Sequence, residues 1–193
     1  MISPIWAVIL SGVLRRAGPA SVPVTRKISI VSVELPLDEA CAEARGLIEY
    51  WQARRLGHEL PTRRNIEVLD LWPLLGRLSL HEVLPDGDLR CRVRGTLLGS
   101  VPGHIKDGMR VSAAKPTDYI EHGTRQLHGT MAARQPRRHR IHLRLGDISH
   151  EFERLSLPLA AQGGVEPPMM LTLVLGDHHR GRYFWNHWAE GCE

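Results

Sequence analysis

Apolar residues recur at helical spacing in two parts of the chain, with polar residues between them. The first set predicts an amphipathic helix over residues 37–55, of about five turns, that ends before Gly57. The second set starts after Pro116 and ends at Pro136, because proline cannot continue a helix there. The apolar face of this second helix is formed by Tyr119, Ile120, Gly123, Leu127 and Met131.

Five further segments have the two-residue alternation, or the continuous apolar run, of a β-strand. Residues 85–88 join the first two as a hairpin, because Pro85 presets φ and Gly87 tolerates a positive φ. The last segment is apolar at nearly every position, which predicts a central strand buried on both faces. The predicted strands are residues 77–84, 89–95, 138–145, 150–159 and 169–175.

The two ends of the chain differ from its middle. Residues 5–14 are apolar but too few to cross a membrane, which takes about 20. Their positive charges follow them, whereas a signal peptide carries its charges first. We therefore expect a flexible or apolar extension over residues 1–35, a main domain over 36–176 and an aromatic tail over 177–193. We expect the tail aromatics to dock on the domain or on a partner subunit. They are Tyr183, Phe184, Trp185 and Trp188.

Composition narrows the class of protein. The chain has 193 residues, enough for one domain with extensions. Its three cysteines, Cys41, Cys91 and Cys192, lie far apart, which excludes a disulfide framework and a cysteine-based zinc site. Reduced thiols favour the cytoplasm. The formal charge is +4, and only three of the 25 basic residues are lysine, a bias that favours a bacterial protein from a GC-rich genome.

The order of two strands, a helical middle and three strands resembles that of a PAS domain. Over residues 37–176 the local sequence also resembles a group of small stand-alone PAS proteins of alphaproteobacteria. It departs from that group at residues 65–68, where a carboxylate-rich turn is usual, and at Gly76, where proline is usual. The matching motifs, in order, are Tyr50-Trp51, Leu60-Pro61-Thr62-Arg63, Leu74-Leu75-Gly76, Arg92-Val93-Arg94-Gly95-Thr96, residues 103–108 between two glycines, and residues 153–159 ending in Pro-Leu.

The resemblance implies an α+β fold with a five-stranded antiparallel sheet, helices on one face and an additional N-terminal amphipathic helix. It implies a non-catalytic sensory or adaptor role in signalling, through a protein partner or a small ligand, and it supplies no particular ligand. We also expect a homodimer, in which the helix of residues 37–55 and the C-terminal aromatics cover each other across a two-fold axis.

The resemblance further implies a cavity between the sheet and the helical middle. On the predicted strand directions no arginine faces this cavity, and Thr96 and Tyr119 supply its only hydroxyl groups. Such a lining favours a small, largely neutral ligand; the alternative is a cavity filled by side chains. The residues expected to line it are Cys91, Val93, Thr96, Tyr119, Ile120, Gly123, Leu143 and Leu157.

Signatures of catalysis and of cofactors are missing from the sequence. It has no Gly-x-Ser-x-Gly and no dinucleotide fingerprint, and Met109 stands where a phosphate-binding loop needs lysine. We therefore expect no enzyme, no catalytic residue and no metal site. His122 and His128 lie off the centre of the apolar helix face, which argues against haem. Neither Cys41 nor Cys91 has the neighbours of a photoactive flavin site, so flavin is rejected.

Arginine-rich strands leave one alternative open. In residues 89–94 apolar residues alternate with arginine, so one face of the strand carries three guanidinium groups. The alternative is a basic anion-binding module that recognises a nucleotide messenger or nucleic acid. Nucleic acid is disfavoured, because these strands contain almost no stacking aromatics. The anion site would consist of Arg90, Arg92, Arg94, Arg138, Arg140 and Arg144.

Overall fold

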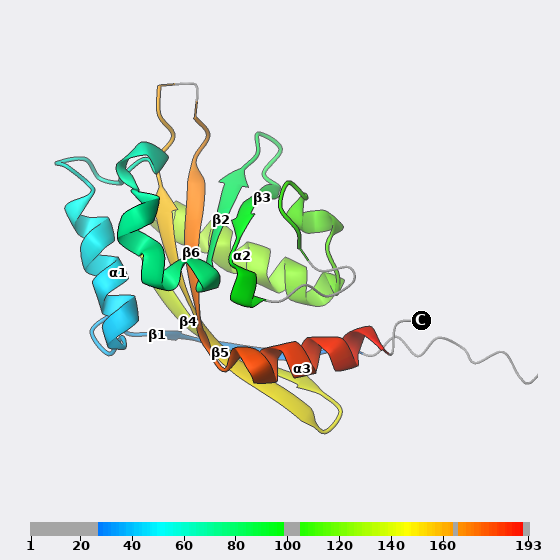
Figure 1. Cartoon of the computed structure of the whole chain (residues 1–193). Coiled ribbons are helices and arrows are strands. Elements are labelled where there is room, and N and C mark those ends of the chain that lie inside the picture. The colour runs from blue at the N-terminus through cyan, green and yellow to red at the C-terminus, as the bar shows by residue number, and fades with distance from the viewer. Residues whose placement is uncertain (1–26, 99–104, 164–165, 191–193) are drawn as a thin grey trace, which may run out of the picture.

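A computed structural model describes residues 27–98, 105–163 and 166–190 of the chain. Its strands form one antiparallel sheet in the order β1-β4-β5-β6-β2-β3 (Figure 1). The α+β class predicted from sequence is confirmed, with six strands in place of five. The strands are β1 (Ser29–Leu35), β2 (Leu78–Val83), β3 (Leu89–Arg94), β4 (Arg137–Leu145), β5 (Ile148–Leu159) and β6 (Met169–Gly176).

The helices begin and end where local chemistry favours it. The longest, α2 (Thr117–Ala133), follows Pro116 and stops at Arg134, whose φ of 54° breaks the helical geometry. The C-terminal α3 (His178–Ala189) is capped by Asp177, whose carboxylate accepts hydrogen bonds from two backbone N–H groups of the first turn. The remaining helices are α1 (Ala42–Ala53) and the 3₁₀ helices η1 (Arg63–Asn65), η2 (Val68–Arg77), η3 (Thr96–Leu98) and η4 (Val111–Ala113).

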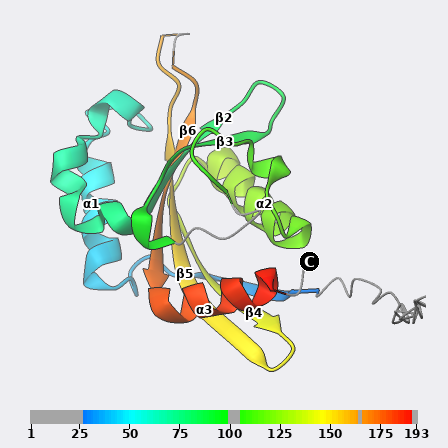
Figure 2. The same ribbon diagram turned by 45° about the vertical axis from the view of Figure 1, so that its right-hand side comes forward.

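Helices cover both faces of the sheet. Figure 2 shows α1 on one side of the strands and α2 on the other, with α3 lying across the lower end. We call these sides the α1 face and the α2 face. The α1 face is an apolar core of α1, η2 and the leucines of β5 and β6, and Trp51 Nε1 donates a hydrogen bond to Pro158 O over 2.9 Å. The prediction of helices on one face therefore describes α2 and α3, whereas α1 and η2 pack on the opposite side.

Strand β1 moves the start of the domain to before the predicted residue 36. It pairs with β4 along its whole length, from Ser29 opposite Arg144 to Leu35 opposite Arg138. Sequence reasoning missed it because apolar residues lie on both of its sides: Ile30 packs inward beside Ser32, which points toward α2, whereas Val31 and Val33 are exposed. The rest of the predicted extension, residues 1–26, lies outside the described residues.

Helix α3 extends the domain beyond the predicted residue 176. Phe184, Trp185 and Trp188 are buried in one apolar cluster with β4 residues such as Leu143. The aromatic tail thus docks on its own sheet. The apolar face of α1 is likewise buried within the chain, so the two surfaces expected to meet in a homodimer are both covered already.

Candidate ligand pocket

A pocket with a volume of about 120 Å³ lies on the α2 face, between the sheet, α2 and α3. Its sheet side is unusually polar, whereas the helices supply mainly apolar and aromatic groups. Strand residues that line it include Ser79, His81, Arg94, Phe152, Arg154, Thr172 and Val174. Helix residues that line it include Val111, Tyr119, Ile120, Gly123, Leu127, Gly181 and Trp185.

An irregularity between β2 and β3 turns Arg94 toward this pocket. Cys91 pairs with His81 and Val93 pairs with Leu80, so Arg92 is an extra residue in β3. Beyond it the alternation is reversed: Arg94 pairs with Ser79 and lines the pocket. Val93 is instead 53% exposed, so the strict alternation expected for residues 89–94 is wrong at its last two residues.

The position of Arg94 changes its electrostatics. Burial lowers the pKa of its guanidinium, while Tyr119, Cys91 and the carboxylate of Asp107 act in the opposite direction. Its Nη2 donates a hydrogen bond to the carbonyl of Leu98 over 2.6 Å. Arg94 is therefore held in place by the short segment that follows β3.

Arg154 of β5 also faces the pocket, and sequence reasoning did not single it out. Its guanidinium lies over α2 at Gly123, where a Cβ atom would come within 3.2 Å of Nη1, so a glycine suits this position. Nη2 donates to the side-chain oxygen of Gln126, whereas Nε is buried without a hydrogen-bond partner. Burial lowers the pKa of Arg154. The expectation that no arginine faces the cavity is wrong for Arg94 and Arg154.

The pKa values of the histidines around Arg154 are lowered, which favours their neutral forms. Burial lowers the pKa of His81 to about 4, and the positive charges of Arg154 and Arg94 act in the same direction. Burial and then Arg154 also lower the pKa values of His122 and His139. These histidines therefore add no positive charge to the pocket.

Three of the eight residues expected from sequence line the pocket: Tyr119, Ile120 and Gly123. The other five lie elsewhere. Leu157 belongs to the α1 face and Leu143 packs against α3. Cys91 is buried near Asp107, and burial raises the pKa of its thiol to about 11. Val93 and Thr96 do not reach the pocket either.

The six arginines of the alternative anion site do not converge. Strands β3 and β4 are separated in the sheet by β5, β6 and β2. Most of these arginines also have partners. Arg90 and Arg92 lie 3.9 and 3.4 Å from Glu82, and Arg138 and Arg140 lie 3.8 and 3.0 Å from Glu153. Arg144 donates to the carbonyl of Gly146, and Arg94 turns to the pocket.

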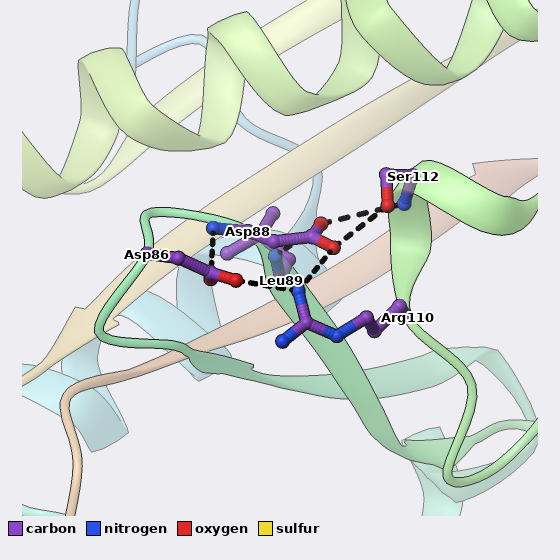
Figure 3. Close-up of polar contacts among 5 residues, drawn as sticks. All are labelled: Asp86, Asp88, Leu89, Arg110 and Ser112. Atoms are coloured by element: carbon purple, nitrogen blue, oxygen red, sulfur yellow. Dashed lines mark hydrogen bonds and ion pairs between the residues drawn. The ribbon is translucent and has the colours of Figure 1, made fainter.

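A polar network joins η4 to the turn between β2 and β3 (Figure 3). Arg110 Nη1 lies 2.7 Å from Asp86 and 3.2 Å from Asp88 in the β2–β3 turn. The Ser112 hydroxyl donates to Asp88 over 2.7 Å. These contacts fix η4 against the hairpin, and Val111 between them is buried and lines the pocket.

The described residues contain no group of three or more His, Cys, Asp or Glu side chains placed to hold a metal ion. Within the same ranges, no helix has the length and apolar character needed to cross a membrane.

A sheet with a pocket under its helices is the arrangement that the sequence resemblance implied. A family comparison shows to which family the chain belongs. A family model described as a PAS domain matches residues 40–170, more than half of the chain. The chain belongs to the PAS domain family. PAS membership indicates a sensory or signalling role. Comparisons with curated proteins and with solved structures found no match.

Proposed function

We propose that this PAS protein is a non-catalytic sensor or adaptor that binds a small ligand in the pocket of the α2 face and passes the change to a signalling partner. The observation that supports this most is the pocket itself, which combines apolar walls with a few convergent polar groups. Such a lining is typical of small-molecule sites.

Helix α3 is the element that would carry the signal. Trp185 lines the pocket and also packs on Tyr119 of α2, with 4.9 Å between ring centroids. On the outer side of the same helix, Tyr183 is exposed. A ligand that contacts Trp185 would favour one docked arrangement of α3 over others, and a partner that binds its outer side would detect the shift.

Native mass spectrometry of the protein purified from its own host tests ligand binding directly. We expect an added mass that is lost on denaturation. Gly123→Leu should fill the pocket and abolish this mass. Gly46→Leu is the matched control, because no atom lies within 4 Å of a Cβ at Gly46. Hydrogen exchange of α3 that is the same with and without the retained mass would contradict the signalling route.

We propose further that the protein acts in the bacterial cytoplasm as a homodimer; its place in the alphaproteobacterial group rests on the sequence motifs. Support for an interface comes from η2, where Leu69 is 81% and Trp72 71% exposed. Light scattering should show a dimer that Trp72→Glu dissociates. Gln52→Glu, which makes the same change of charge on the exposed side of α1, should leave it intact.

A further inference from the structure

The charge of Arg154 is not balanced by the described protein. No Asp or Glu of the described residues forms an ion pair with it, and its one hydrogen bond goes to the neutral side chain of Gln126. Arg94 differs, because the negative charge of Asp107 partly offsets the lowering of its pKa by burial. Arg154 is partly buried and its Nε is fully enclosed. An uncompensated charge in such a place is costly, so a protein that keeps one usually gives it a partner.

Donors of Arg154 remain available for such a partner. Nε is buried without a partner, and Nη1 makes no hydrogen bond within the described chain. His81, which also lines the pocket, is buried and has an unpartnered Nδ1. A guanidinium presents paired N–H groups that match the two oxygens of a carboxylate.

The other walls indicate what the anion carries. Ile120, Leu127, Val174 and Trp185 surround the pocket with apolar and aromatic surface. Its volume of about 120 Å³ allows only a small molecule. Two further charged residues of the lining, Arg182 and Asp177, have opposite signs, so the charge of Arg154 is the one left over. One such positive charge matches one negative charge, and apolar walls match an apolar body.

We infer that the pocket binds a small organic monocarboxylate, with its carboxylate on Arg154 and its apolar body between Ile120 and Trp185. This inference rests on the proposed ligand-binding function and specifies its ligand class.

Binding of probe acids tests the inference. Titration calorimetry would compare benzoate and butyrate with their neutral amides and with inorganic phosphate. We expect the acids to bind the parent at least about tenfold more tightly than the amides or phosphate. Arg154→Gln should weaken the acids by about tenfold or more, whereas Arg144→Gln, which removes one exposed charge, should not.

A second measurement needs no ligand. Arg154→Met keeps much of the side-chain volume and removes the unbalanced charge, so the ligand-free protein should melt about 2–4 °C higher than the parent. A lower melting temperature would show that the arginine is a structural residue and would overturn the inference.

The remaining outcomes separate the two proposals. Acids that bind Arg154→Gln as tightly as the parent, or amides or phosphate that bind as tightly as the acids, overturn the monocarboxylate assignment and leave the pocket as a ligand site. A retained ligand that carries no charge would likewise overturn the monocarboxylate assignment and leave the pocket as a ligand site. The absence of any retained mass, together with no binding of acids or amides, overturns the ligand-binding function itself.

Discussion

The two faces of the central strands have opposite chemistry. In β5 the residues toward α1 are Leu155, Leu157 and Leu159, all fully buried. The residues toward α2 in the same strand include His150, Phe152 and Arg154, which line the pocket. Because alternate side chains of a strand point to opposite faces, one strand can hold a core and a site without conflict.

Because of this difference, the α1 face mainly stabilises the fold, whereas the α2 face holds the candidate site. Each leucine on the α1 face removes apolar surface from water, a gain of roughly 2 kcal/mol per side chain. The α2 face instead buries polar atoms without partners, among them His81 Nδ1 and Arg154 Nε, and each costs about 1–3 kcal/mol. Substitutions on the two faces should therefore have different consequences.

The largest effect is expected from Leu173→Asp on the α1 face. Leu173 is fully buried in β6, so the new carboxylate would lose its hydration without gaining a partner. We expect a loss of more than about 4 kcal/mol in the free energy of unfolding, measured by urea denaturation. A variant that melts within a degree or two of the parent would contradict the placement of β6.

Truncation of one leucine should cost somewhat less. Leu155→Ala leaves a cavity in the α1 face and should lower the free energy of unfolding by about 3–4 kcal/mol. Its neighbour Ser156, also buried but on the α2 face, is the matched control. Ser156→Ala should cost about 1 kcal/mol or less. Equal losses for the two variants would contradict the division between the faces.

Acid should destabilise the α2 face through His81. Its pKa is about 4 in the folded protein, against the ordinary histidine value of 6.5 in the unfolded chain, so between these values the unfolded chain binds more protons. Stability is therefore lost as the pH falls from about 6.5 to about 4, by up to about 3 kcal/mol. Urea midpoints across this window should show a smaller slope for His81→Phe. An unchanged slope would mean that His81 is not buried in neutral form.

The smallest effect is expected from Thr172→Val on the α2 face. The Thr172 hydroxyl donates a long hydrogen bond, 3.4 Å, to the carbonyl of Ser79. Its loss should change the free energy of unfolding by less than about 1 kcal/mol, because the shape of the side chain is kept. Thermal melting would measure it, and a loss comparable to that of Leu155→Ala would show that polar groups on this face support the fold.

Much of the fold follows from sequence periodicity. The helical spacing of residues such as Leu47 and Trp51 predicted α1, and the apolar run of residues 169–175 predicted β6. Both elements are buried as expected. Strand β1 was not predicted, because its register is set by backbone pairing with β4 and its apolar residues Val31 and Val33 face outward.

The site was harder to predict because it depends on side-chain direction. The extra residue Arg92 reverses the alternation of β3, and no sequence pattern marks it. Arg154 did have a signal. Since Leu155 and Leu157 define one apolar face of β5, the residue before them must point to the other face. A charged group that is covered by helices on that face requires a partner or a ligand.

Strand β1 has a consequence for any attempt to transplant this PAS domain onto another protein. The family match starts at residue 40, after β1. Ser32 of that strand accepts a hydrogen bond from Gln126, and Gln126 in turn accepts one from Arg154. A fusion cut at the family boundary would uncover the edge of β4, inviting pairing with other chains, and would release the support behind the pocket arginine. The transplantable unit therefore begins before Ser29 and includes α3.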